Sequence, residues 1–338
     1  MEKVKINFVN FWGDFNKEDN FITEIIKTKY QVEISENPDY VFVSVLGEDM
    51  DFLKYEDAIR IFYTGENVIP DFNLYDYAIG FCHLKFSDRY MRYPLYRNKI
   101  YRENWKKAQL KHTIPRREYE QKHTGFCNFV YSNSQIVMPE REQLLNMMDL
   151  YKRVDCGGRY RNNVGGPVAD KLEFCSNYKF TIAVENTSSP GYTTEKLIDA
   201  WAAGTIPIYY GDPLIAKEFN NKAFVNCHDY DNFEDVMEVV KKLDTNDDAY
   251  AEMMSEPICM FSENSDETDS ELRDFILHIL SQPKECAYRR DRYAWGKVYE
   301  NRLIGLYELK NNVIIKALYK TYKTLKSTMF KLFRKKRG

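Results

Sequence analysis

The chain has 338 residues, more than one hydrophobic core usually organises, so its length predicts two domains. Hydrophobic residues make up 44% and charged residues 29% of it, as in ordinary soluble globular proteins. Residues 310–338 contain ten Lys or Arg and no acid, so the remaining 38 basic and 51 acidic residues balance to −13. An acidic body of this kind argues against nucleic-acid binding.

The seven cysteines are an odd number without a CxxC pair, which argues against a disulfide framework and against a structural zinc site. The N-terminal residues lack the apolar region of a signal peptide, and no run of about 18 apolar residues occurs. These features predict a cytosolic, reduced protein.

Short apolar runs rich in Val, Ile, Phe and Tyr alternate along the chain with segments of helical period. Strands are predicted at 5–11, 40–46, 58–63 and 77–81, and in a second series at 126–131, 180–184, 206–209 and 224–226. Helices are predicted at 140–151, 194–203, 233–242 and 270–280. This alternation predicts two Rossmann-like α/β domains with parallel sheets and a cleft at the carboxyl ends of the strands.

Residues 96–123 are dense in Lys, Arg and Tyr and show no strand pattern, so they are predicted to connect the two domains. The boundary is therefore placed near residue 124. Neither GxGxxG nor GxxxxGK[ST] occurs, which removes the main support for a nicotinamide cofactor or a P-loop.

Residues 178–196, which read YKFTIAVENTSSPGYTTEK, carry the densest chemistry. The segment begins as a strand and ends in the polar pair Glu185 and Asn186, where the carboxyl edge of a sheet faces a ligand. A loop rich in Ser, Pro and Gly follows, and a second helix-forming segment comes after it. This order of elements predicts a ligand-binding loop between a strand and a helix.

Thr193 or Thr194 is predicted to cap that helix. The free backbone N–H groups at a helix start favour a diphosphate. Lys196 in the first turn adds positive charge, and Glu195 is suited to accept hydrogen bonds from ribose hydroxyls. The alternative interpretation is a capped helix with two solvated charges.

Several segments together resemble the α-1,3/4-fucosyltransferases of bacterial type, glycosyltransferase family 10. They are FYTGEN at 62–67, DYAIGF at 76–81, DRY at 88–90, PLY at 94–96, FCNFVYSN at 126–133, VDCGG at 154–158, the 178–196 segment and IPIYYG at 206–211. They follow one another over roughly residues 60 to 230, so the resemblance covers both predicted domains.

The resemblance implies a GT-B fold, in which two Rossmann-like domains face a central cleft. It implies an acceptor-binding domain at 1–123, a GDP-fucose-binding domain at 124–285, a helical segment at 286–309 that packs back on the first domain, and a tail at 310–338. It also implies that GDP-fucose is bound by Arg141, Asn186, Tyr192, Thr194, Glu195 and Lys196. Arg141 would make a bidentate contact to the pyrophosphate; the alternative is an exposed residue early in its helix.

The family reaction inverts the anomeric centre, so it needs a base for the acceptor hydroxyl and positive charge for the leaving GDP. Where some relatives have an acidic residue after the equivalent of residues 80–81, this chain has His83, which becomes the candidate base. Alternatively, His83 binds the acceptor and a carboxylate takes the proton. The candidate carboxylates are Glu66, Asp88 and Glu185, and the acceptor side is assigned to Glu66, Asp88 and Arg89.

The second half contains no DxD motif, and the charges of Arg141 and Lys196 can replace a metal ion. No cofactor is therefore expected to be required, and a divalent metal is expected at most to stimulate. Apolar residues from Ile314 to Leu332 recur at helical spacing opposite a row of lysines. This basic amphipathic helix predicts a protein peripheral on the inner face of the cytoplasmic membrane, bound to anionic lipid; a partner helix and a solvated end are the alternatives.

The sequence therefore predicts fucosyl transfer from GDP-fucose to the 3-hydroxyl of N-acetylglucosamine in an N-acetyllactosamine-type oligosaccharide, in Lewis-type or O-antigen synthesis. Two alternatives stay open: a GT-B transferase that uses another GDP-sugar, and a glycan-binding relative without catalysis, which the missing carboxylate at residue 83 motivates.

Overall fold

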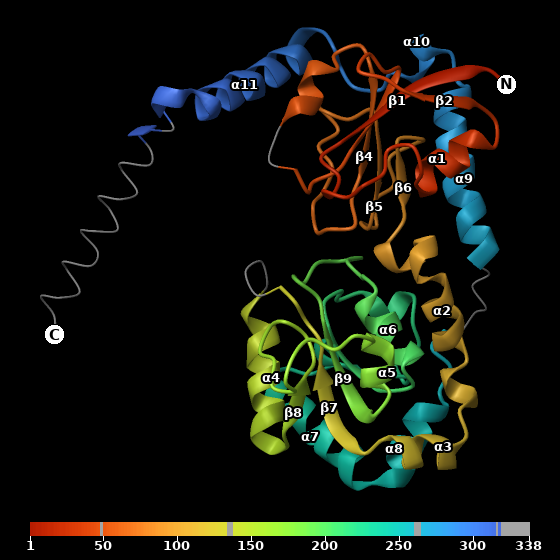
Figure 1. The fold of residues 1–338 in the computed structure, drawn as a ribbon, viewed down its shortest axis with the longest axis vertical. Helices are drawn as coiled ribbons and strands as arrows, with labels where there is room; N and C mark the ends of the chain where they lie inside the picture. Colours follow the sequence, from red (N-terminus) through yellow and green to blue (C-terminus); the bar gives the residue numbers. More distant parts are fainter. Residues whose placement is uncertain (48–49, 134–137, 260–264, 316, 319–338) are drawn as a thin grey trace, which may run out of the picture. The chain divides into compact units, whose positions relative to one another are not determined.

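The computed structural model describes residues 1–47, 50–133, 138–259, 265–315 and 317–318. Its first sheet has six strands in the order β2-β1-β3-β4-β5-β6 (Figure 1). The strands are β1 (Lys3–Val9), β2 (Gln31–Ile34), β3 (Tyr40–Val43), β4 (Ile59–Tyr63), β5 (Tyr77–Gly80) and β6 (Tyr90–Arg92). The pairs β1–β2, β1–β3 and β3–β4 are parallel, as the sequence predicts.

The second sheet has the order β11-β10-β9-β7-β8, and its four strand pairs are all parallel. Its strands are β7 (Gly125–Phe129), β8 (Val154–Cys156), β9 (Tyr178–Val184), β10 (Ile206–Tyr210) and β11 (Val225–Asn226). From β7 the next strand, β8, lies at one edge of the sheet, whereas from β9 the chain continues through β10 to β11 at the other edge. Connections that leave neighbouring strands in opposite directions open a crevice at the carboxyl ends, which is where doubly wound sheets bind ligands.

Helices α1 to α6 lie between strands along the chain, and α7 to α11 follow the last strand, β11 (Figure 1). They are α1 (Phe21–Lys27), α2 (Arg102–Gln109), α3 (Arg116–Lys122), α4 (Pro139–Tyr151), α5 (Lys171–Cys175), α6 (Lys196–Ala202), α7 (Phe233–Thr245), α8 (Asp247–Ser255), α9 (Ser265–Ser281), α10 (Lys284–Ala287) and α11 (Ala294–Asn311). The eight predicted strands and four predicted helices are thus confirmed, with shifted ends.

The second sheet is buried on both faces, because successive side chains of a strand point in opposite directions. On β9, Ile182 and Val184 join a core formed with α4, α7 and α8. The intervening Ala183 belongs to a second core with Trp201 of α6 and Trp105 of α2. Burial of both faces explains why this strand ends in the continuous apolar run Ile182–Val184.

Contacts divide the chain into two compact units. One comprises Met1–Tyr63, Pro70–Ala78 and Ile279–Gly338, and the other comprises Thr64–Ile69 and Ile79–His278. These units group residues 79–123 with the second sheet, whereas the sequence-based boundary lies near residue 124. The domain boundaries at 123, 285 and 309 stay predictions.

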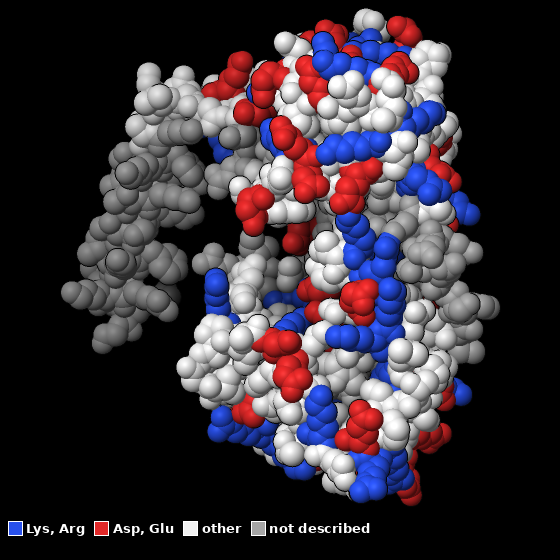
Figure 2. Space-filling model, turned by 45° about the vertical axis from the view of Figure 1, so that its right-hand side comes forward, with Lys and Arg blue, Asp and Glu red and all other residues white. Residues whose placement is uncertain are grey.

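Basic and acidic side chains are mixed over the face of the molecule in Figure 2. Within the described part of the chain, no helix combines the length and the apolar character that a membrane crossing requires. Most of the predicted amphipathic tail, residue 316 and residues 319–338, lies outside the described residues.

Candidate functional site

A cavity of about 440 Å³ lies in the second unit, where the chain leaves β7 and β9. It is lined by Val130, Tyr131, Ser132, Asn133, Arg141, Lys171, Thr181, Ile182, Asn186, Glu195 and Lys196. Four of the six residues predicted to bind the donor, namely Arg141, Asn186, Glu195 and Lys196, therefore meet at one cavity. The cavity lies at the point where the strand order reverses, between β7 and β9, and residues that follow both strands reach it.

Arg141 is buried in the first turn of α4, not exposed as the alternative interpretation had it. Its Nη2 donates to the carbonyl oxygen of Val184 at 3.0 Å and to Oδ1 of Asn186 at 2.7 Å. The guanidinium lies over the ring of Tyr131, 4.3 Å from its centroid. Its Nε is buried and has no hydrogen-bond partner among the described residues. The guanidinium is thus held rigidly with a donor still unused.

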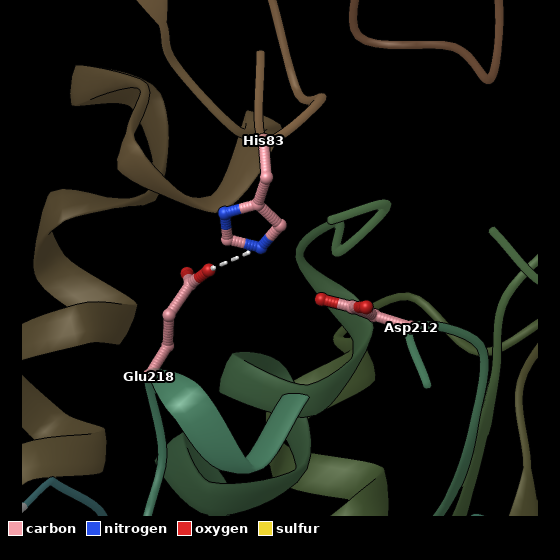
Figure 3. A group of neighbouring side chains, drawn as sticks. All are labelled: His83, Asp212 and Glu218. Carbon is pink, nitrogen blue, oxygen red and sulfur yellow. Dashed lines mark ion pairs between the residues drawn. The ribbon is translucent and has the colours of Figure 1, made fainter. Parts of the chain in front are cut away.

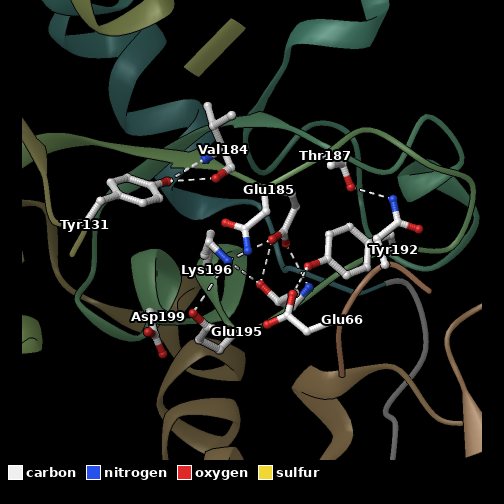
Figure 4. Close-up of polar contacts among 12 residues, drawn as sticks. Glu66, Tyr131, Val184, Glu185, Thr187, Tyr192, Glu195, Lys196 and Asp199 are labelled. Carbon is white, nitrogen blue, oxygen red and sulfur yellow. Dashed lines mark hydrogen bonds and ion pairs between the residues drawn. The ribbon is translucent and has the colours of Figure 1, made fainter. Parts of the chain in front are cut away.

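Lys196 and Glu185 form the polar centre beside this cavity (Figure 4). The Lys196 Nζ lies 2.9 Å from Oε2 of Glu185 and 2.8 Å from Oγ1 of Thr194. Burial by itself lowers the pKa of Lys196, but the carboxylates of Glu185 and Glu195 outweigh it, so the pKa is raised. Lys196 therefore carries a positive charge at the cavity wall at neutral pH.

Glu185 is fully buried and accepts two further hydrogen bonds from Thr194, at 2.7 Å from its backbone N–H and at 2.6 Å from its hydroxyl. With Lys196, three donors occupy this carboxylate. A carboxylate in this environment holds the loop and the lysine in place.

The predicted threonine cap of α6 is wrong. The helix begins at Lys196, its N-cap is Glu195, and no side chain caps it. The hydroxyl and N–H of Thr194 are turned to Glu185 instead. The segment therefore presents Lys196 to the cavity through this side-chain network. Helix α6, with seven residues, is too short for its first turn to bind an anion by itself.

Tyr192 and Thr194 are buried next to the cavity and do not line it. The Tyr192 hydroxyl donates to Oε2 of Glu66 at 3.2 Å. Glu66, which was predicted on the acceptor side, therefore contacts the loop between β9 and α6. Asp88 is paired with His278 at 3.3 Å, and Arg89 lies over the ring of Phe86. Neither Asp88 nor Arg89 lines the cavity.

His83 follows β5, and its side chain is 32% exposed. Its Nε2 lies 3.6 Å from Oε1 of Glu218. Burial and the nearby Arg92 lower the pKa of His83, against the opposing effect of Glu218. The imidazole is therefore neutral at pH 7, which is the form in which histidine accepts a proton.

Among the described residues, His83, Asp212 and Glu218 bring ligand atoms within 4.8 Å of one another (Figure 3). The geometry alone would suit a cation. However, Nη2 of Arg92 lies 2.5 Å from Oε1 of Glu218 and supplies the positive charge that this carboxylate needs. The cluster is therefore explained as an ion-pair network.

Sequence reasoning missed Lys171, Tyr131, Arg92 and Glu218. Lys171 lines the cavity and pairs with Asp199 at 2.6 Å. A lysine in the first turn of a helix is unfavourable for the helix dipole, so the same signal that drew attention to Lys196 was present at Lys171. Glu218 carries no such signal, because only the fold brings it to His83.

Comparison with known proteins gives consistent matches. Residues 6–100 match the model of the alpha-(1,3)-fucosyltransferase FucT N-terminal domain, and residues 119–255 match the C-terminal model of glycosyltransferase family 10 (fucosyltransferase). The alpha-(1,3)-fucosyltransferase FucT of Helicobacter pylori is 38% identical over 287 residues, which cover 75% of this chain and 60% of that protein. The chain thus spans about 60% of the length of this relative.

Solved structures extend the likeness to the fold. A crystal structure of an alpha1,3-fucosyltransferase with GDP-fucose is 32% identical, with a TM-score of 0.66 over 82% of this chain and 91% of that one. A crystal structure of an alpha1,3-fucosyltransferase gives 32% identity and a TM-score of 0.69 over 87% and 93%. These matches confirm the GT-B fold class, and the chain belongs to glycosyltransferase family 10, the fucosyltransferases.

Proposed function

We propose that this protein transfers L-fucose from GDP-fucose to the 3-hydroxyl of N-acetylglucosamine in an N-acetyllactosamine-type glycan. The observation that carries the proposal is the cavity at the carboxyl ends of β7 and β9, where the buried Arg141 and the partly exposed Lys196 supply two positive charges. A diphosphate carries the matching negative charge. Support comes from the similar structure that is described as containing GDP-fucose.

The donor pyrophosphate is proposed to lie against Arg141 and Lys196. Arg141 offers its unpaired Nε together with a planar guanidinium, which suits phosphate oxygens. Glu195 at the same wall accepts from ribose hydroxyls, and its pKa is lowered because Lys196 and Lys171 outweigh the effect of burial. Asn186 and Tyr192 hold the loop on either side of the donor, and Thr194 positions Lys196.

Inversion is proposed to occur in one displacement. The acceptor hydroxyl gives its proton to His83 while its oxygen forms a bond to C1 of fucose, and the C1–O bond to the diphosphate breaks toward GDP. The charge that develops on the leaving phosphate is stabilised by Arg141 and Lys196. Glu185 is proposed to hold Thr194 and Lys196 in place, because three donors from these two residues occupy its carboxylate.

Glycosyl-transfer assays with GDP-fucose and N-acetyllactosamine test the function. Wild type is expected to release GDP and form a fucoside whose linkage analysis shows attachment at the 3-hydroxyl. His83→Ala is expected to lower kcat by about a hundredfold or more, the range for loss of a general base. Absence of GDP release above the hydrolytic background in wild type would sink the catalytic claim and favour a glycan-binding relative.

Donor identity is tested by competition. GDP-fucose is expected to displace labelled GDP at lower concentration than GDP-mannose, and the reverse order would favour the alternative GDP-sugar. Treatment with EDTA is expected to leave the rate within about twofold, because Arg141 and Lys196 supply the charge that a metal ion would bring.

The basic tail is proposed to bind the anionic inner face of a bacterial membrane, where acceptors for O-antigen or Lewis-type glycans are carried. A chain cut after Asn312 keeps α11 and is expected to lose sedimentation with vesicles that contain phosphatidylglycerol. Equal sedimentation of the cut and full chains would contradict the proposal.

A further inference from the structure

The imidazole of His83 lies beside a carboxylate that the proposed reaction leaves without a role. Its Nε2 is 3.6 Å from Oε1 of Glu218, a contact that becomes an ion pair when the imidazole is protonated and that Figure 3 draws as a dashed line. One oxygen of Glu218 is ion-paired with an arginine, and the other accepts a hydrogen bond. Oε1 lies 2.5 Å from Nη2 of Arg92, and Oε2 accepts from the hydroxyl of Tyr96 at 2.6 Å. A carboxylate anchored in this way has a defined position from which to orient an imidazole.

Arg92 also fixes the segment that carries His83. Its Nε donates to the carbonyl oxygen of Phe81 at 2.8 Å, two residues before the histidine, and its Nη2 reaches the carbonyl oxygen of Gly191 at 3.4 Å. One guanidinium therefore connects the His83 segment, the Gly191 loop and Glu218, all within the second unit.

Asp212, the third member of the cluster, is committed elsewhere. Its Oδ1 accepts from the backbone N–H of Gly191 and of Leu214, both at 2.8 Å, and its Oδ2 accepts from the hydroxyl of Thr193 at 3.4 Å. Asp212 therefore shapes the loop. Glu218 is the carboxylate whose oxygen is directed at the imidazole.

We propose that Glu218 is a positioning residue for His83: its carboxylate, 3.6 Å from Nε2, favours the tautomer with the hydrogen on Nε2, which leaves the lone pair of Nδ1 to receive the proton of the acceptor hydroxyl. The inference rests on the proposed function, in which His83 is the base. The proton passes from the acceptor oxygen to Nδ1, the oxygen pair bonds to C1, and the electrons of the breaking C1–O bond leave with GDP. The carboxylate of Glu218 stabilises the imidazolium that forms, the task of the third group in catalytic triads.

The charges that face His83 predict how its titration responds. Arg92 and Lys217 oppose the imidazolium, while Glu218 and Asp212 favour it. Loss of the Glu218 charge removes one of the two favourable partners. The pKa of His83 is therefore expected to fall, and the acid limb of the kcat profile is expected to move to lower pH.

The test compares Glu218→Gln with wild type in kcat, in KM for both substrates and in the pH profile of kcat. Glutamine keeps the size and an acceptor for Tyr96 and removes the charge. We expect kcat to fall by about tenfold or more while the Kd for GDP stays within about twofold. We also expect the acid limb to shift downward. Glu238→Gln makes the same charge change at an exposed position of α7 and should leave kcat, the Kd for GDP and the acid limb unchanged.

A double substitution distinguishes positioning from general structural support. In His83→Glu the base is a carboxylate, which needs no anionic partner, so adding Glu218→Gln should cost no further activity. A loss in that background as large as in wild type would overturn the proposal.

The remaining outcomes separate the inference from the function on which it rests. Full activity in His83→Ala would remove the base itself. A strong effect of His83→Ala together with no effect of Glu218→Gln would overturn only the positioning role. Loss of wild-type activity in EDTA with recovery in Mn²⁺, absent in Glu218→Gln, would make the cluster a metal site and overturn it as well.

Discussion

Arg141 is held by groups that a lysine cannot all satisfy. Its Nη2 bonds to Val184 and Asn186, and its guanidinium lies on the ring of Tyr131. Arg141→Lys keeps the charge and loses the planar fork and the buried Nε–H. A charge-assisted hydrogen bond contributes about 1.5–3 kcal/mol, so the Kd for GDP should rise about tenfold or more.

Calorimetric titration with GDP measures this change. Arg153→Lys is the matched control, because Arg153 is 69% exposed and pairs with Asp155 on the protein surface. The control should bind GDP as wild type does. A Kd for Arg141→Lys within twofold of wild type would mean that Arg141 supports the loop without contacting the donor.

Residues of the site could be predicted from the sequence where they belong to a local motif. Lys196 and Glu195 stand in one motif with Glu185 and Asn186, so sequence reasoning placed them together. The direction of their side chains was not predictable, because Thr194 bonds to Glu185 where a helix cap was expected. The contact between His83 and Glu218 depends on tertiary structure alone.

Gly191 lies where the loop between β9 and α6 contacts the segment after β5. Its φ is +86°, and a Cβ there would lie 2.6 Å from the carbonyl oxygen of Phe81 and 3.2 Å from Cδ2 of His83. Gly191→Ala therefore adds both backbone strain and a clash with main chain that cannot move aside freely. We expect a lower Tm and a fall in kcat of about tenfold or more, since a displacement near 1 Å is costly for positioned groups.

Thermal unfolding and steady-state rates measure both effects. Gly305→Ala is the control, because Gly305 lies in α11 with no atom within 4 Å of the added Cβ. Alanine is the better helix former by about 1 kcal/mol, so this control should raise the Tm slightly. Wild-type activity in Gly191→Ala would show that the two loops need not touch.

Helix α11 is attached to the first unit by a buried ion pair. Oε1 of Glu300 lies 2.7 Å from Nη2 of Arg60 on β4, and both side chains are almost fully buried. Arg290 pairs with Asp76 in the same unit. Glu300→Gln leaves a buried cation without its counter-charge, so the free energy of unfolding should fall by about 3 kcal/mol.

Denaturant titration of the full chain detects this loss in the transition of the first unit. Glu308→Gln changes the same charge on the exposed side of α11 and should shift the midpoint little. An unchanged midpoint for Glu300→Gln would contradict a structural role for the pair. Local sequence patterns predicted eight strands and the helices α4, α6, α7 and α9, whereas the short strands β2, β6 and β8 lack enough residues for a pattern.

The stability of the protein also depends on a charged group that does not line the cavity. Lys111 is fully buried in the second unit, and its Nζ donates to the carbonyl oxygen of Met253 at 2.8 Å. Burial lowers the pKa of Lys111 to about 7, against the weaker opposing effect of Glu256. Between this value and the unfolded value of about 10.4, the unfolded chain binds the extra proton.

The sign of the pH effect follows from this difference. Because the unfolded state binds more protons, the free energy of unfolding contributed by Lys111 rises with pH, by at most about 1.4 kcal/mol per pH unit. Lys111→Met removes the titrating group at similar volume. Denaturant titrations at pH 7.5 and 9.5 should therefore show a steeper gain for wild type than for Lys111→Met. Parallel slopes would mean that Lys111 keeps its ordinary pKa. Water would then have to hydrate its ammonium group inside the protein.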